Sequence, residues 1–146
     1  LILILMMAGC CAVTFAINLP SEQSGNASDH CKEEWTKRGV LDQGMYAYCM
    51  GQQHEGYLNL VSLSRKYSNQ PWIQEAVDFA LKEWTKRGVR QDSMVHYALN
   101  QITEGYEDLV YMSKQPGWDR NKYQACSSKW GIQFNMVVFC IKMLAD

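Results

Sequence analysis

The residues of this chain with the clearest chemical potential are its six cysteines. Four of them make two local pairs, Cys31 with Cys49 and Cys126 with Cys140. Thiols oxidise outside the cytoplasm, whereas a zinc site favours closely spaced pairs that these four cysteines do not make, so a four-thiolate metal site is the weaker alternative. The cysteines therefore predict two disulfides in an extracytoplasmic protein, with no metal or cofactor.

An internal repeat supports the first pairing. With an offset of 49 residues, 31–64 matches 80–113 at 16 of 34 positions, including a shared Trp-Thr-Lys-Arg-Gly-Val phrase. Cys31 and Cys49 are both replaced by alanine in the second copy. Two cysteines that change together to a small apolar residue are expected to touch each other.

A third copy near the C-terminus has both cysteines again. Cys126 and Trp130 match Cys31 and Trp35, and further on Met136, Phe139 and Cys140 match Met45, Tyr48 and Cys49. Repeats of this length are usually stacked helical units, because one unit cannot bury its apolar face alone. The sequence therefore predicts an all-α domain over residues 30–146, built from three stacked helical hairpins with a repeat of about 46–49 residues.

Helical spacing and turn residues place six helices and no strand. Their expected ranges are 29–38, 42–67, 71–87, 92–115, 118–130 and 133–145. Gly39 and Gly88 fit the left-handed position that ends a helix. Gly56 and Gly105 lie in the middle of long helices, where each costs about 1 kcal/mol relative to alanine. A glycine at the same place in both copies predicts a close approach between helices.

The N-terminal run Leu1–Leu19 carries no charge and has a helical length close to the thickness of a bilayer. Three interpretations of residues 1–20 stay open: an uncleaved membrane anchor, a lipoprotein signal whose Cys10 would be acylated, and an ordinary cleaved signal. All three put the domain in the periplasm or at the cell exterior. Residues 21–29 are polar and predict a flexible tether.

Two basic pairs, Lys37–Arg38 and Lys86–Arg87, recur at the expected ends of short helices. Positive charge there complements the helix dipole. The functional alternative is a basic ridge that meets lipid headgroups, a glycan or an acidic partner.

Other candidate residues have structural explanations. Glu55 and Glu104 are a possible pair of catalytic carboxylates, but their equivalent places in two copies also suit a structural role. The histidines His30, His54 and His96 do not follow the repeat and suit surface or cap positions. The remaining aromatic residues suit core packing more than a sugar-binding platform: Tyr46, Tyr57, Trp72, Tyr106, Tyr111 and Trp118.

Composition narrows the function further. A net charge of −1 argues against a nucleic-acid binder, and no phosphate-binding loop or zinc-finger spacing is present. We expect a non-enzymatic, membrane-tethered interaction protein, an accessory subunit or scaffold with a protein partner in a membrane assembly. The alternatives are an envelope enzyme that acts on glycan through Glu55 or Glu104, and a secreted ligand-binding protein.

The pattern Cys-x3-Trp followed by Met-x2-Tyr/Phe-Cys resembles a motif of small secreted or lipid-anchored bacterial proteins, mostly without assigned function. It is carried here by the first and third copies, while the middle copy departs from it at both cysteines. The resemblance covers about half of the chain and implies an extracytoplasmic helical protein, with no catalytic residue.

The repeat makes a direct prediction for its middle copy. Ala80→Cys together with Ala98→Cys should form a disulfide readily and raise the free energy of unfolding, because the two positions copy the geometry of a bridged pair. Free-thiol titration and thermal unfolding with and without reductant would measure this. A double variant that stays reduced, or that is destabilised by oxidation, would show that the copies are not equivalent.

Overall fold

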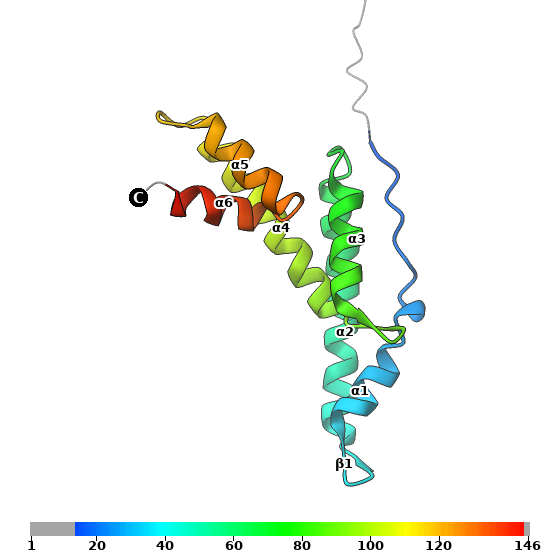
Figure 1. The fold of residues 1–146 in the computed structure, drawn as a ribbon. Coiled ribbons are helices and arrows are strands. Elements are labelled where there is room, and N and C mark those ends of the chain that lie inside the picture. The colour runs from blue at the N-terminus through cyan, green and yellow to red at the C-terminus, as the bar shows by residue number, and fades with distance from the viewer. Residues whose placement is uncertain (1–13, 145–146) are drawn as a thin grey trace, which may run out of the picture.

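The chain is mostly helical in the computed structural model, which describes residues 14–144. The described residues form six α-helices, shown in succession in Figure 1: α1 Ala27–Trp35, α2 Gln43–Lys66, α3 Ile73–Trp84, α4 Asp92–Met112, α5 Arg120–Trp130 and α6 Phe134–Met143. The prediction of a predominantly helical protein is thereby confirmed. Asp42 caps α2 through a bond from the Met45 N–H to its carboxylate, and Asp119 caps α5 in the same way.

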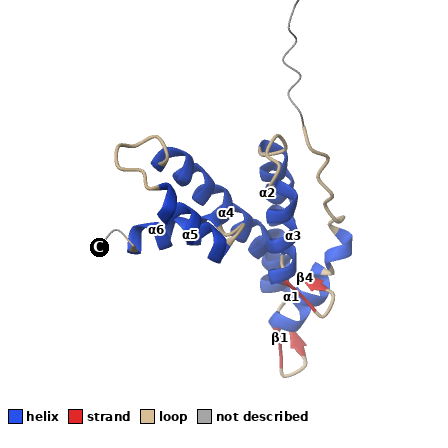
Figure 2. Ribbon diagram, turned by 45° about the horizontal axis from the view of Figure 1, so that its top comes forward, coloured by secondary structure: helices blue, strands red, loops and turns tan. Residues whose placement is uncertain are grey.

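Two short β-hairpins correct the expectation of helices alone. Strand β1 (Thr36–Lys37) pairs with β2 (Val40–Leu41), and β3 (Thr85–Lys86) pairs with β4 (Val89–Arg90), as Figure 2 shows in red for the labelled strands. The first connects α1 to α2 and the second connects α3 to α4. The repeated Trp-Thr-Lys-Arg-Gly-Val phrase therefore forms a helix end followed by a hairpin.

The hairpin turns explain why these strands look like helix ends in the sequence. Each loop has two residues, and both have positive φ: 53° and 79° at Arg38 and Gly39, 54° and 76° at Arg87 and Gly88. Positive φ at both central residues is the requirement of a type I′ turn, whose twist suits a tight hairpin. A left-handed glycine fits both a helix C-terminus and this turn, so glycine alone does not distinguish them.

Consecutive helices pack in pairs, α1 on α2, α3 on α4 and α5 on α6. A disulfide joins Cys31 of α1 to Cys49 of α2, with Cα atoms 5.7 Å apart. A second joins Cys126 of α5 to Cys140 of α6, also with Cα atoms 5.7 Å apart. Both predicted pairings are confirmed, and both separations are typical of disulfides.

The long helices contact one another at the two mid-helix glycines. A Cβ placed on Gly56 of α2 would lie 2.8 Å from the carbonyl carbon of Asp92, at the start of α4. A Cβ on Gly105 of α4 would lie 2.6 Å from the Cα of Asn135, at the start of α6. The predicted close approach is confirmed. The middle of α2 contacts the first turn of α4, and the middle of α4 contacts the first turn of α6.

Two hydrophobic clusters form the core. The larger joins α2, α3 and α4, with the buried residues Leu60, Tyr67, Ile73, Ala76, Val77, Ala80, Val95, Leu99 and Ile102. The smaller joins the end of α4 to α5 and α6, with Leu109, Cys126, Val137, Val138 and Ile141. Phe134 packs against both clusters and connects them.

Residues 14–20 have no regular secondary structure and run as an extended segment beside the helices (Figure 1). The Phe15 N–H donates to the carbonyl of Ser68, and the backbone of Asn18 exchanges two hydrogen bonds with the Gln74 amide. Ile17 and Leu19 pack against the larger core cluster. This conformation differs from the membrane segment expected over residues 1–20. Cys10 and the rest of that segment lie outside the described residues.

Residues 21–29 also differ from the flexible tether that we expected. They include a 3₁₀ turn at Gln23–Gly25 and the start of α1 at Ala27, and Ser21 and Ser24 bond to Arg90. A polar sequence with three serines is typical of a flexible segment, but a buried guanidinium needs acceptors, and this segment supplies them. Among residues 14–144, no helix combines the length and apolar character needed to cross a membrane.

Gly56→Ala should lower the free energy of unfolding by about 1–3 kcal/mol, because the new methyl group overlaps backbone atoms of the first turn of α4. Gly105→Ala should behave alike at α6. Gly51, exposed on α2 with open space around its Cα, is the matched control. Gly51→Ala should raise stability by up to about 1 kcal/mol. Urea unfolding would measure all three, and equal effects of the three variants would refute the contact.

Candidate functional site

The four basic residues singled out in the sequence lie on the two β-hairpins and not at helix ends. Lys37 and Arg38 lie on the first hairpin, and Lys86 and Arg87 lie on the second; all four are exposed. Within the part of the chain that the structure describes, none of them is in a salt bridge. We call the segments Thr36–Leu41 and Thr85–Arg90 the basic hairpins.

Local bonds hold the basic hairpins in place. The N–H of Asp42 donates to the carbonyl of Trp35, and the N–H of Gln91 donates to the carbonyl of Trp84, both at 3.0 Å. The second hairpin has an extra support, because the amide of Asn26 donates to the Gly88 carbonyl at 2.9 Å. The exposed tips are thus presented on ordered turns.

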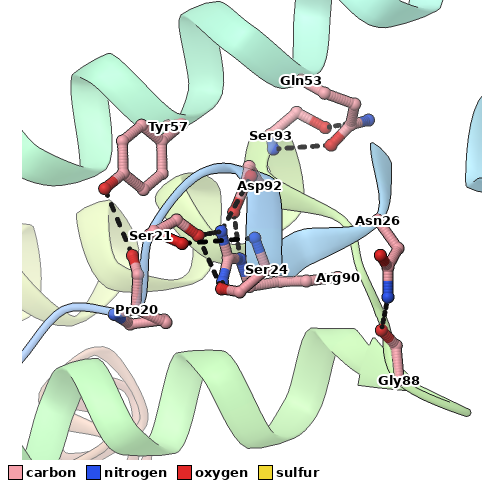
Figure 3. A network of polar contacts seen from close by, with 10 residues as sticks. All are labelled: Pro20, Ser21, Ser24, Asn26, Gln53, Tyr57, Gly88, Arg90, Asp92 and Ser93. Carbon is pink, nitrogen blue, oxygen red and sulfur yellow. Dashed lines mark hydrogen bonds and ion pairs between the residues drawn. The ribbon is translucent and has the colours of Figure 1, made fainter. Parts of the chain in front are cut away.

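A buried ion pair lies at the end of the second hairpin that leads into α4, where the N-terminal segment, α2 and α4 meet (Figure 3). Arg90 bonds through Nε and Nη2 to the carboxylate of Asp92, with 3.2 Å between Nη2 and Oδ2. The guanidinium also donates to the Ser21 carbonyl at 3.0 Å and to the Ser24 hydroxyl at 3.3 Å. Arg90 therefore ties the N-terminal segment to the start of α4.

Neighbouring groups enclose this ion pair. The Tyr57 ring lies 5.8 Å from the guanidinium carbon, and its hydroxyl donates to the Pro20 carbonyl at 3.2 Å. Gly25 has space only for hydrogen, because a Cβ would lie 2.9 Å from Arg90 Nη2. Burial raises the pKa of the Asp92 carboxyl, and the hydrogen bonds and positive charge of Arg90 oppose that rise. The arrangement has the character of a structural lock.

The start of α4 is further fixed to α2 by a pair of reciprocal bonds. The Gln53 amide donates to the Ser93 hydroxyl, and the Gln53 carbonyl oxygen accepts from the Ser93 N–H, both at 3.3 Å. A side chain of α2 thus satisfies one of the free N–H groups at the first turn of α4. These bonds lie next to the Gly56 contact and reinforce it.

Three potential metal ligands gather beside the first disulfide. Atoms of His30, Glu34 and Cys49 lie within 4.8 Å of one another. Cys49 is bonded to Cys31, so its sulfur has no thiolate to offer a metal. His30 Nε2 lies 3.4 Å from Glu34, and this pair is better described as a polar contact along α1.

The two glutamates considered as catalytic carboxylates lie on the surface of the protein. Glu55 and Glu104 are both exposed, on α2 and α4, and Glu104 accepts bonds from the amides of Asn100 and Gln101. Glu55 lies near His96, whose pKa is lowered by burial, with the Glu55 charge opposing that change. A general acid normally lies in a desolvated site with a tuned pKa, so these positions do not favour the enzyme hypothesis.

The aromatic residues considered as a sugar-binding platform divide among several places. Trp72, Tyr106 and Trp118 line one hollow of about 360 Å³, together with Tyr123 and Phe134. Trp72, Tyr106 and Phe134 also contact one another, with ring centroids 4.8–5.7 Å apart. Three of these six residues therefore pack between the second and third helix pairs. Tyr46, Tyr57 and Tyr111 lie elsewhere.

Arg90 and Asp92 were not recognised from the sequence. The available signal was a break in the repeat, since the first copy has Leu41 and Gln43 at the matching positions. A charged pair that appears in one copy alone marks a contact that the other copy does not make. Here that contact is with the N-terminal segment.

Asp92→Ala should lower the free energy of unfolding by about 3–5 kcal/mol, because it leaves the Arg90 guanidinium buried without its counter-ion. It should also speed amide exchange in the part of the N-terminal segment around Ser21 and Ser24, which Arg90 holds. Arg87→Ala, an exposed change in the same hairpin, is the control and should stay within about 0.5 kcal/mol of the parent. Urea unfolding and hydrogen–deuterium exchange would measure both effects. Unchanged exchange around Ser21 and Ser24 would contradict the lock.

No family model matches this chain, and no curated protein or solved structure matches it either. The resemblance to small secreted or lipid-anchored bacterial proteins stays a prediction. Function is therefore inferred from the residues and contacts described above.

Proposed function

We propose that this protein is a non-enzymatic, membrane-tethered interaction protein outside the cytoplasm, built as a three-hairpin repeat, whose basic hairpins bind an acidic partner protein. The two disulfides indicate an oxidising, extracytoplasmic environment. A role as accessory subunit or scaffold suits stacked helical hairpins, because they offer extended surfaces to partners.

The observation that carries the proposal is the arginine at the first turn position of both basic hairpins. Arg38 and Arg87 have positive φ, which costs roughly 1–2 kcal/mol for a residue with a side chain. Asn-Gly or Asp-Gly would suit these turns better. Both arginines are exposed and make no ion pair among residues 14–144, so the fold gains nothing evident from them. An unfavourable residue kept twice at an exposed tip supports a binding role.

The position of the first basic hairpin favours a protein over the lipid headgroups of an anchoring membrane. The first basic hairpin lies at the start of α2, whereas Phe15 bonds to Ser68, just past the end of α2 (Figure 1). Helix α2 has 24 residues and is therefore about 36 Å long. Electrostatic attraction in physiological salt fades over about 8 Å. A membrane near residue 14 would thus lie beyond the reach of Lys37 and Arg38.

The docking of residues 14–26 supports a fixed presentation of the hairpins. A flexible tether would let the domain tumble, whereas bonds to Ser68, Gln74 and Arg90 hold this segment along the body. A segment held in this way fixes the orientation of the domain relative to residue 14. Restricted orientation lowers the entropic cost of binding a partner in the same assembly.

Arg38→Asn with Arg87→Asn provides the sharpest test. Asparagine suits the turn, so the free energy of unfolding should stay equal or rise by up to about 1 kcal/mol per site. Recovery of the partner should nevertheless fall, because the positive charges of Arg38 and Arg87 have been removed. We would extract native membranes in mild detergent, capture the tagged full chain and quantify co-purified proteins. Zero-length carbodiimide coupling should join Lys37 or Lys86 to partner carboxylates.

A second variant set provides the matched control. Charge reversal at Lys37, Arg38, Lys86 and Arg87 should abolish recovery, while reversal at four other exposed cations should not: Arg65, Lys114, Arg120 and Lys129. Recovery from the parent should also fall as salt rises, as expected for a charged interface. A partner retained by the hairpin variants, or cross-links confined to other lysines, would overturn the proposal.

A further inference from the structure

One aromatic position is exposed in all three copies of the repeat. Tyr48, Tyr97 and Phe139 occupy matching places in α2, α4 and α6, and their exposed fractions are 61%, 56% and 57%. The residues that follow them in the chain, Cys49 and Cys140, belong to the disulfides. We call these three rings the aromatic column, because they share one position in the successive copies of the repeat.

The aromatic column has no evident role in the fold. Scattered exposed apolar residues are ordinary on a protein surface. The other large exposed hydrophobic residues of the described chain do not recur in this way: Leu58 and Tyr111, for example, match Glu107 and Ser62. A ring that is kept in three copies at a solvent-facing position is better explained by a ligand than by packing.

The third copy of the repeat indicates which part of the aromatic side chain would contact a ligand. Phe139 lacks the hydroxyl of Tyr48 and Tyr97, so the shared feature is the face of the ring. An aromatic face carries partial negative charge and attracts the weakly positive C–H groups of a saturated ring. The apolar face of a sugar offers such groups.

The surroundings of the rings favour a sugar over the core of a protein interface. Gln52 and Gln101 follow Tyr48 and Tyr97 by four residues and therefore lie one helical turn away. An interface core needs a contiguous apolar patch, whereas Tyr48 and Tyr97 stand beside amides; at the third ring Met143 takes the place of the glutamine. A side-chain amide both donates and accepts hydrogen bonds, as a sugar hydroxyl requires.

A hollow beside the first ring has matching chemistry. It has a volume of about 260 Å³, and its lining includes the rings of Trp35 and Tyr48 and the polar side chains of His30, Gln52 and Gln91. This volume is below the usual range of drug-sized sites, so it suits a single small unit of a larger ligand. Glu34 also lines the hollow, so the lining combines aromatic faces with hydrogen-bond donors and acceptors.

We propose that the aromatic column binds a neutral polysaccharide, with one sugar ring stacked on each of Tyr48, Tyr97 and Phe139. Gln52 and His30 hydrogen-bond to the hydroxyls of the sugar at the first ring. A ligand of repeated units suits a platform of repeated rings, and several weak contacts on one chain combine into useful affinity. This site adjoins the first basic hairpin, since Lys37 Nζ lies 6.0 Å from the Trp35 ring, but it uses other residues and does not rest on the function proposed for the hairpins.

The test uses the intact chain and oligosaccharides of defined composition. Cello- and chito-oligosaccharides of one to six units, with soluble peptidoglycan fragments, would be titrated by calorimetry and by NMR shift mapping. At least one hexasaccharide should bind, and its affinity should exceed that of the matching monosaccharide by at least tenfold. Shifts should centre on the three rings.

Variants then separate stacking from other effects. Tyr48→Ala, Tyr97→Ala and Phe139→Ala combined should weaken hexasaccharide binding at least tenfold, while Tyr48→Phe should retain it. Tyr111→Ala with Leu58→Ala, equally exposed but outside the column, should leave binding unchanged. Circular dichroism would verify that every variant folds. Absence of binding to all oligosaccharides would overturn the proposal, as would loss of a captured protein from the triple variant with unaltered sugar binding.

Discussion

The constraint on which the rest of the structure depends is the contact between a mid-helix glycine in the second helix of one pair and the first turn of the second helix of the next pair. Gly56 receives Asp92–Ser93, and Gly105 receives Phe134–Asn135. Because glycine has no Cβ, the two backbones come into direct contact. This contact fixes where α4 crosses α2 and where α6 crosses α4 to within one helical turn. The direction of each crossing then determines which side chains are covered and which, like Tyr48 and Tyr97, remain in solvent.

The two junctions use different chemistry in the same geometry. At the first, the Arg90–Asp92 ion pair lies beside Tyr57 and reaches the N-terminal segment. At the second, Phe134 takes the place of Asp92 and packs with Trp72 and Tyr106. A buried ion pair is costly unless every donor has a partner, so the first junction depends on Ser21 and Ser24. The aromatic junction has no such requirement, since dispersion and apolar burial stabilise it.

Features of the structure that depend on neighbouring or repeated residues could be predicted from the sequence, whereas features that depend on the angle between helices could not. The disulfides and the glycine contacts were predictable, because the repeat showed which residues change together and which recur. The basic hairpins were not, because Arg-Gly is an unusual pair for a type I′ turn and resembles a helix end. The exposure of Tyr48 was also hidden. Helical spacing assigns residues to a face, but only the angle between neighbouring helices decides whether that face is covered.

The distribution of the disulfides follows from the order of the helix pairs. The α3–α4 pair has neighbours on both sides, since α4 packs against α2 and α6, and it contributes most of the larger core cluster. The α1–α2 and α5–α6 pairs have a neighbouring pair on one side within the described chain. They contribute fewer buried residues to the core clusters, and a bridge across a short loop restores about 3 kcal/mol to each by restricting the unfolded chain. Alanine at positions 80 and 98 therefore occurs in the pair that contributes most residues to the core. The cysteines occur in the two pairs where packing alone contributes least to the stability of the fold.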